Sequence, residues 1–225
     1  MKNKKAIILL SGGLDSYVAL DMVIKKYSNM YAINFNYGQK AFREENLASK
    51  RIAKRYNLTL KTIKLPFLMR LCDNALTNKD NDGFENFDQV WIPNRNGLFI
   101  NIAACYCDKY LIDEIILGLN YEEAQNFSDN SIKFIKSVNR SLKNSTLNAP
   151  KVIAPCKNMT KVDIVNYAID NKMPLDLIKS CYDSSEHSSQ KHCAKCMSCK
   201  LLYNAIKISK RPELIKEIFN ESIVC

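Results

Sequence analysis

The sequence predicts an α/β protein built on a doubly wound parallel sheet of about five strands. Short, almost wholly apolar segments alternate along most of the chain with longer segments whose apolar residues recur at helical spacing. Apolar runs of this kind are typical of strands buried on both faces of a parallel sheet. The alternation stops after Leu175, where a polar, Cys-rich segment and then a helical pattern follow. We therefore expect an α/β domain over residues 1–175 and a small helical appendage over residues 176–225.

The individual elements follow from the same patterns. Residues 6–10 are apolar throughout, whereas residues 60–65 alternate apolar and polar side chains. The predicted strands are residues 6–10, 31–35, 60–65, 114–119 and 151–155. The predicted helices are residues 15–26, 44–56, 97–110, 130–142, 160–171 and 200–219, with Thr160 as an N-cap. Residues 66–94 show no period and predict a long loop, which is a candidate active-site flap.

The composition is that of a globular protein, since 47% of the 225 residues are apolar, 25% are charged, and only 6 Gly and 6 Pro are present. The apolar run near the N-terminus is too short for a signal peptide, and no run approaches the ~18 residues of a membrane span. We therefore expect a cytoplasmic protein without membrane contact. The net charge of +10 is spread along the chain, which favours a solvated basic surface over a dedicated RNA-binding patch.

A phosphate-binding turn is predicted between the first strand and the first helix, at Ser11-Gly12-Gly13-Leu14-Asp15-Ser16. Backbone N–H groups at a helix N-terminus carry partial positive charge, and adjacent glycines allow close approach of a phosphate. A Gly-Gly turn alone is a common structural feature, but the full string resembles the pyrophosphate loop of the PP-loop ATPases. It lacks the Gly-Lys-Ser/Thr of a Walker loop and the spacing of a dinucleotide-binding turn.

The resemblance to PP-loop enzymes implies ATP as a substrate, with Mg2+ to neutralise its phosphates. In that class an oxygen atom of the second substrate attacks the α-phosphate, and a nucleophile such as ammonia or a sulfur carrier then displaces AMP. The residues implied in nucleotide binding are Leu10, Ser11, Gly12, Gly13, Leu14, Asp15, Ser16, Tyr17, Val18, Ala19 and Leu20. Within this set, Asp15 is expected either to hold a metal ion or to cap the helix.

Four of the nine cysteines lie close together near the C-terminus. Two-residue gaps let thiolates converge on one ion, and four thiolates complete the tetrahedral shell of a structural zinc ion. The predicted zinc ligands are Cys181, Cys193, Cys196 and Cys199, with His187 and His192 as spare ligands of lower rank. An iron–sulfur cluster and unligated thiols are the alternatives. The other cysteines are not expected to be ligands, and Cys105 is predicted to lie buried on the apolar face of its helix.

Further segments place the sequence close to one family. Read in order, the chain resembles the 7-cyano-7-deazaguanine synthases almost from end to end. Besides the loop at residues 10–16, the segments that carry this resemblance are Asn36-Tyr37-Gly38-Gln39, Ile92-Pro93-Asn94-Arg95-Asn96, Lys161-Val162-Asp163-Ile164-Val165, Ser180-Cys181-Tyr182 and His192-Cys193-Ala194-Lys195-Cys196-Met197-Ser198-Cys199. Three departures from the family are Lys40-Ala41 in place of a basic residue and His, residues 127–131 in place of Pro-Asp-Cys-Arg, and Ala194 in place of Gly.

The resemblance implies a two-stage, ATP-dependent reaction within queuosine or archaeosine biosynthesis. The carboxylate of 7-carboxy-7-deazaguanine is adenylated and converted by ammonia to an amide, whose oxygen is then activated and lost to leave a nitrile. A homodimer is implied, and tRNA binding is not required. Three alternatives stay open: a relative that stops at the amide, a PP-loop tRNA-thiolating enzyme, and a non-catalytic nucleotide-binding or zinc-dependent module.

The same resemblance suggests roles for individual side chains. The catalytic residues are expected to be Asp15, Ser16, Lys161 and Arg95, and the substrate-binding residues Tyr37, Gln39, Arg95 and Asp129. Position alone also allows Lys161 to be a solvated surface charge, Arg95 to form a helix-end salt bridge, and Asp129 or Ser128 to be a helix N-cap. Trp91 is expected either in the core or over the deazapurine ring. No general base stands out, because a carboxylate is already nucleophilic and adenylation needs little acid–base chemistry.

Overall fold

The protein forms a five-stranded, wholly parallel sheet, as the sequence predicts. The computed structural model describes residues 4–72, 74–78, 87–182 and 191–219. The strands are β1 (Lys5–Leu9), β2 (Asn29–Asn36), β3 (Leu60–Lys64), β4 (Glu114–Ile116) and β5 (Lys151–Ile153). Their order across the sheet is β3-β2-β1-β4-β5. The chain therefore runs outward from β1 in both directions, which places a topological switch point between β1 and β4.

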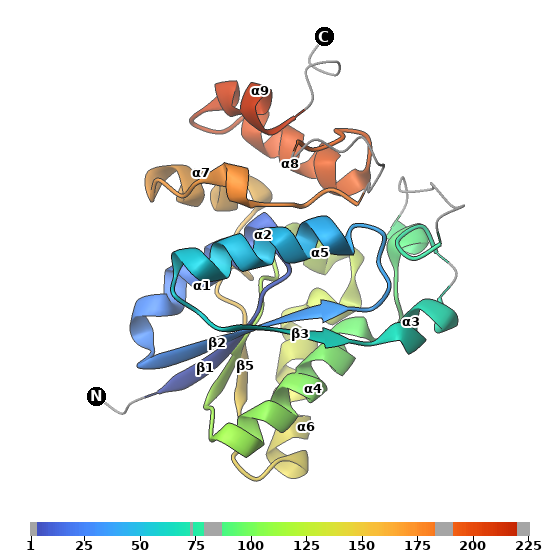
Figure 1. The fold of residues 1–225 in the computed structure, drawn as a ribbon, viewed down its shortest axis with the longest axis vertical. Helices are drawn as coiled ribbons and strands as arrows, with labels where there is room; N and C mark the ends of the chain where they lie inside the picture. The colour runs from blue at the N-terminus through green and yellow to red at the C-terminus, as the bar shows by residue number, and fades with distance from the viewer. Residues whose placement is uncertain (1–3, 73, 79–86, 183–190, 220–225) are drawn as a thin grey trace.

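Helices cover both faces of the sheet, with α1 and α2 on one face and α4 and α6 on the other (Figure 1). These helices are α1 (Leu14–Val23), extended by η1 (Ile24–Lys26), α2 (Phe42–Arg55), α4 (Arg95–Tyr110) and α6 (Ile132–Ser145). A further helix, α7 (Lys161–Asp170), packs on α1. Thr160 caps α7 in a reciprocal capping box with Asp163, which confirms the predicted N-cap.

The apolar strands are buried on both faces because helices cover both faces. Ile7 and Ile8 of β1 point to opposite sides of the sheet and are only 1% and 0% exposed. One prediction about the core is wrong. Cys105 of α4 is exposed, and Cys107 is the buried residue. Residues that are two positions apart in an α-helix are separated by about 200° around the helix axis. The two thiols therefore lie on opposite sides of α4.

Two short helices lie where the sequence predicts loops. The stretch of residues 66–94 opens with α3 (Pro66–Leu71), where Pro66 stands in the first turn and Leu68 is buried, and it also contains η2 (Phe87–Val90). Part of the candidate flap, residues 79–86, lies outside the described residues. After β4 comes α5 (Tyr121–Asn126). Helices of six residues are too short to show a clear helical period in the sequence.

The C-terminal segment packs on the α/β unit as an outer layer (Figure 1). After η4 (Leu175–Leu177), α8 (Met197–Lys207) lies against α7, and η5 (Pro212–Leu214) and α9 (Ile215–Ile218) follow. The single helix predicted over residues 200–219 is wrong, because Pro212 lacks a backbone N–H and begins a new helical turn. Leu202 and Phe219 belong to the same apolar core as the sheet. The domain boundary at residue 175 stays a prediction. Among the described residues, none of the helices combines the length and apolar character that a membrane crossing needs.

Candidate active site and metal centre

The loop between β1 and α1 forms the centre of the site. Gly12 has a φ of +91°, and a Cβ atom there would lie 2.5 Å from the Glu45 carbonyl oxygen, so only glycine fits. Ser16 Oγ donates to the Gly13 carbonyl oxygen at 2.9 Å and lies 3.1 Å from Ser11 Oγ. These contacts hold a tight turn that leads directly into the N-terminus of α1. The turn therefore presents backbone N–H groups and hydroxyls to an anion.

A cavity of about 240 Å³ lies beside this loop, at the carboxyl ends of β1, β2 and β4. This position at the switch point is where doubly wound sheets bind ligands. Of the residues implied in nucleotide binding, those that line the cavity are Leu10, Ser11, Gly13, Leu14, Asp15 and Ser16. The residues that follow in α1, Tyr17, Val18, Ala19 and Leu20, are 0% exposed. These four fix α1 in the core, and their direct contact with a nucleotide stays a prediction.

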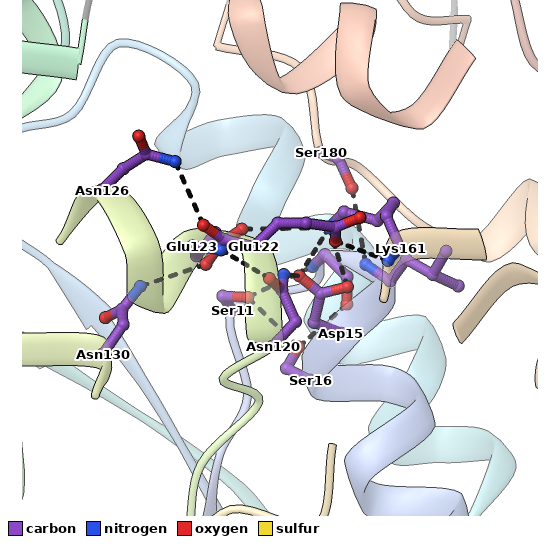
Figure 2. A network of polar contacts seen from close by, with 12 residues as sticks. Ser11, Asp15, Ser16, Asn120, Glu122, Glu123, Asn126, Asn130, Lys161 and Ser180 are labelled. Carbon is purple, nitrogen blue, oxygen red and sulfur yellow. Dashed lines mark hydrogen bonds and ion pairs between the residues drawn. The ribbon is translucent and has the colours of Figure 1, made fainter. Parts of the chain in front are cut away.

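Asp15, in the first turn of α1, lies at the centre of a polar network (Figure 2). Lys161 Nζ donates to Asp15 Oδ1 at 2.8 Å and to Asp15 Oδ2 at 2.6 Å. Asn120 Nδ2 donates to Asp15 Oδ2 at 2.9 Å, and Glu123 Oε1 lies 3.8 Å from the Lys161 amine. The network thus joins the N-terminal ends of α1, α5 and α7, which are far apart in sequence. Lys161 is the principal partner of the Asp15 carboxylate.

The charges in this network are set by burial and by mutual attraction. Burial raises the pKa of Glu123, because a desolvated carboxylate is costly. Burial acts to lower the pKa of Lys161, but the Asp15 and Glu123 carboxylates outweigh it, and the net pKa is raised. Lys161 is therefore a cation at neutral pH, although its side chain is only 11% exposed. The alternative that Lys161 is a solvated surface charge is wrong.

Three predicted substrate-binding residues line the same cavity. Arg95 begins α4, and its Nη1 donates to Tyr37 Oη at 3.0 Å. Among the ion pairs of the described residues, none involves Arg95, so the helix-end salt bridge is wrong. The Gln39 amide is engaged within the protein: its Oε1 accepts from Tyr37 N at 2.9 Å, and its Nε2 donates to Glu45 Oε2 at 2.9 Å. Contact of Gln39 with a substrate stays a prediction.

A second, smaller cavity of about 60 Å³ adjoins the first. The residues that line both are Arg95, Glu123, Asn130 and Tyr182. Two aromatic rings line the second cavity, Trp91 and Phe127, stacked with centres 5.6 Å apart and planes inclined by 7°. Trp91 is half-buried at this wall, so its expected place in the core is wrong. That Trp91 covers a deazapurine ring stays a prediction.

Asp129 also lines the second cavity, within η3 (Ser128–Asn130). Its side chain is buried, and burial raises its pKa while nearby Arg95 acts to lower it. Ser131 is the residue whose side chain caps α6, accepting from Phe134 N at 3.1 Å. The alternative that Asp129 or Ser128 is the N-cap of this helix is therefore wrong.

The segment just before the cysteine cluster contacts the phosphate-binding loop directly. Lys179 N donates to the Gly12 carbonyl oxygen at 2.9 Å, and Leu14 N donates to Ser180 Oγ at 3.4 Å. Ser180 N in turn donates to His192 Nε2 at 3.0 Å. Burial lowers the pKa of His192 to about 4, so the ring is a neutral acceptor. The C-terminal layer thus holds one side of the loop in place.

The four predicted cysteine ligands come together. The Sγ atoms of Cys181, Cys193, Cys196 and Cys199 all lie within 4.8 Å of one another. Those of Cys193 and Cys199 are 3.8 Å apart. Four thiolates at about 2.3 Å from one tetrahedral ion lie about 3.8 Å from one another, so the cluster fits a single metal ion. The spare ligand His192 is engaged by Ser180, and His187 lies outside the described residues.

Several residues of the site were given no role from the sequence, although Ser180 lies in one of the segments that carry the family resemblance. They are Glu45, Asn120, Glu123, Lys179 and Ser180. Asn120 and Glu123 did carry a signal, because a cap residue followed three positions later by Glu is typical of a helix start. Glu45 and Lys179 carried none. Only the packing of α2 and of the C-terminal segment against the loop brings them to the cavity.

Fold and site together define a PP-loop protein, in which an anion-binding turn opens on the switch point of a parallel sheet. Residues 5–209 match the profile of the family described as Queuosine biosynthesis protein QueC, and the chain belongs to this family. It is 41% identical over 214 residues to the 7-cyano-7-deazaguanine synthase of Carboxydothermus hydrogenoformans, a match that covers 90% of this chain and 98% of that protein. The 7-cyano-7-deazaguanine synthase of Methanosarcina mazei is 36% identical over 220 residues, a match that covers 90% of this chain and 94% of that protein.

Solved structures support the same fold. The U34-tRNA thiolase NcsA from Methanococcus maripaludis, solved with its 4Fe-4S cluster, superposes with a TM-score of 0.53 at 19% identity, covering 96% of this chain and 68% of that one. A 4-thiouridine synthetase in a complex with RNA and bound ATP superposes with a TM-score of 0.52 at 20% identity. The match covers 96% of this chain and 49% of that one. At these identities the likeness shows the fold alone. It does not favour the tRNA-thiolating alternative.

Proposed function

We propose that this protein converts 7-carboxy-7-deazaguanine and ammonia to 7-cyano-7-deazaguanine with consumption of ATP, in queuosine biosynthesis. The observation that carries the proposal is the turn at residues 11–16 facing a cavity at the switch point, in a chain that belongs to the QueC family. Relatives at 41% and 36% identity over nearly their whole length have the name of this synthase. The protein is therefore a ligase that forms carbon–nitrogen bonds.

The turn and its neighbours bind the triphosphate. The pyrophosphate oxygens accept hydrogen bonds from backbone N–H groups at the start of α1 and from the hydroxyls of Ser11 and Ser16. Lys161 turns from Asp15 toward the α-phosphate, where its charge stabilises the negative charge that develops as an oxygen attacks phosphorus. Mg2+ supplies further neutralisation of the phosphates, and the carboxylates available to hold it are those of Asp15 and Glu123.

The second substrate occupies the adjoining cavity. Arg95 lies on the boundary of the two cavities, where its guanidinium can grip the substrate carboxylate before adenylation. The stacked Trp91 and Phe127 rings form a flat apolar wall suited to a deazapurine. The buried Asp129 accepts hydrogen bonds from the N–H groups of the guanine-like edge, and Tyr37 and Gln39 complete the first cavity.

The cysteine cluster holds one structural zinc ion. A 4Fe-4S cluster needs its thiolates on different iron atoms, and hence farther apart than the thiolates of one ion. The mutual approach of the four Sγ atoms to within 4.8 Å supports a mononuclear site instead. With all four positions filled by thiolate, the ion has no open site for catalysis. A homodimer, a cytoplasmic location and independence from tRNA binding remain part of this proposal.

The test is mass spectrometry of a reaction with 7-carboxy-7-deazaguanine, ATP, Mg2+ and ammonium. A nitrile product that disappears in the Asp15→Ala variant supports the proposal. Accumulation of the amide without nitrile would point to the relative that stops at the amide, for which the altered segment at residues 127–131 is the sequence ground. No product with ATP untouched would refute the proposal and redirect the search to tRNA.

A further inference from the structure

Glu45 is a titratable side chain of the first cavity that the proposed function leaves without a role. It stands in the first turn of α2 and lines the cavity together with Asp15, Arg95 and Lys161. Its own backbone carbonyl is so close to the phosphate-binding loop that a Cβ atom at Gly12 would meet it at 2.5 Å. The Glu45 carboxylate is therefore held beside the place where the adenylated substrate forms.

Gln39 fixes the orientation of this carboxylate. Gln39 Nε2 donates to Glu45 Oε2 at 2.9 Å and to the Phe35 carbonyl oxygen at 3.0 Å. Gln39 Oε1 accepts from Tyr37 N at 2.9 Å, so the amide cannot rotate without losing three contacts. Among the residues that the structure describes, Glu45 Oε1 accepts no hydrogen bond. This second oxygen is available to a group in the cavity.

The electrostatic surroundings leave Glu45 with an intermediate basicity. Burial raises its pKa to about 6, while the hydrogen bond from Gln39 acts to lower it. Of the charged groups that face it, Arg95 and Lys179 act to lower the pKa and Glu44 acts to raise it. At neutral pH the side chain is thus ionised but more basic than an ordinary carboxylate. Such a group is well matched to proton transfer near neutral pH.

The other carboxylates of the cavity both lie beside the Lys161 amine. Within the described residues, the acidic side chains that line it are Asp15, Glu45 and Glu123. Asp15 contacts the Lys161 amine at 2.6 Å, and Glu123 lies 3.8 Å from the same amine. Glu45 forms no ion pair with a lysine or arginine in this part of the chain. Of these three carboxylates, Glu45 is the one that does not pair with Lys161.

The reaction needs a proton acceptor after adenylation. When ammonia attacks the adenylated carbonyl, a C–N bond forms, the C–O bond to AMP breaks, and the nitrogen has one proton to lose. In the second stage the amide oxygen attacks the α-phosphate of another ATP and pyrophosphate leaves. Two N–H protons then depart as the C–O bond to AMP breaks and the C–N bond becomes a nitrile. None of these losses occurs in the adenylation of the carboxylate.

We propose that Glu45 is the proton acceptor of the amide-forming and nitrile-forming steps, taking protons from the substrate nitrogen at Oε1 and releasing them to solvent, with Gln39 as its positioning residue. This assignment rests on the proposed function. It adds a general base, which the sequence did not reveal. It also gives Gln39 a role through Glu45.

The test compares Glu45→Gln with a matched control, Glu44→Gln, the adjacent carboxylate, which does not line the cavity. Exchange of pyrophosphate into ATP, dependent on 7-carboxy-7-deazaguanine, reports adenylation alone, and we expect Glu45→Gln to keep it within about threefold. Amide and nitrile formation should fall by roughly 100-fold or more, the usual contribution of a general base. Glu44→Gln should resemble the wild type in both assays.

The pH profile gives the second readout. Product formation by the wild type should decline below an apparent pKa near 6 as Glu45 is protonated, and Glu45→Gln should lack this inflection. Gln39→Leu, which removes the hydrogen bond that lowers the Glu45 pKa, should move the inflection to higher pH. Wild-type product formation by Glu45→Gln, or an equal loss of exchange and product formation, would overturn the assignment. Absence of exchange in the wild type would instead refute the proposed function, and the assignment would fall with it.

Discussion

Gly118→Ala tests whether close packing at the end of β4 holds the phosphate-binding loop. A Cβ atom at Gly118 would lie 2.5 Å from both the backbone N and the Cα atom of Ser16, whereas ordinary contact begins at 3.4 Å. The two segments must therefore separate by about 0.9 Å, the difference between these distances. Because both contacted atoms belong to the backbone, no change of rotamer relieves the overlap. The N-terminus of α1, which we propose binds the pyrophosphate, has to move.

The expected cost follows from this displacement. Overpacking of this kind destabilises a protein by about 1–3 kcal/mol, and each kcal/mol lowers the Tm of a chain of this size by about 2–4 °C. We therefore expect a fall in Tm of roughly 2–12 °C in a thermal unfolding scan. Loss of one hydrogen bond to a phosphate costs about 1.5–3 kcal/mol, so calorimetry should find ATP bound roughly 10- to 150-fold more weakly.

The matched control is Gly97→Ala. There the three atoms nearest to the added Cβ atom all belong to the side chain of Asn94, with Oδ1 at 2.1 Å, and this side chain can rotate away. Gly97 also lies inside α4, where alanine is favoured over glycine by about 1 kcal/mol. We expect its Tm and its ATP affinity to stay close to those of the wild type. A Gly118→Ala variant with unchanged Tm and unchanged ATP affinity would refute the packing argument.

Three further predictions concern the charges and the metal. Lys161→Met leaves the buried Asp15 carboxylate without a cationic partner, which lowers the free energy of unfolding by up to about 3–5 kcal/mol in a thermal scan. The double variant with Asp15→Asn should recover part of this loss, and no recovery would contradict the pairing. Cys196→Ser should abolish stoichiometric zinc in metal analysis and weaken ATP binding, because the segment before the cluster contacts the loop; iron with acid-labile sulfide in the wild type would contradict the zinc assignment. Glu45→Gln should exceed the wild type in stability at pH 8 and equal it at pH 4. The pKa of Glu45 is about 6 in the folded protein and 4.5 for an ordinary glutamate, so the stability of the wild type falls as the pH rises from 4.5 to 6. Equal stabilities of the two proteins at pH 8 would contradict the raised pKa.

The parts of the site that could be predicted from the sequence are those whose residues are close together in the chain. The turn at residues 11–16 is one such part, because its glycines and hydroxyls act within a single βα connection. The last three cysteines of the cluster are a second such part, because gaps of two residues allow neighbouring thiolates to approach one ion. Missed elements such as α5 are local too, but they are too short to show a period.

The cavity itself could not be predicted in the same way. Asp15 and Lys161 are 146 positions apart, and no pattern in either segment indicates that they pair. In the sequence, Glu45 is an ordinary polar residue of an amphipathic helix. Its carboxylate lines the cavity because α2 packs on the loop and because Gln39 donates a hydrogen bond to that carboxylate. Trp91 and Phe127 likewise stack only because residues before α4 and after α5 meet.

The sequence by itself therefore determined the class of fold, the glycine-rich turn and the cysteines that come together near the C-terminus, while the tertiary structure decided which other side chains face the cavity. Periodicity and turn chemistry act over a few residues, through backbone hydrogen bonds and side-chain spacing. The neighbours of a side chain in the cavity depend instead on the strand order β3-β2-β1-β4-β5 and on which helix covers which face. That order follows from how the whole core packs, so it becomes visible only when the chain is folded.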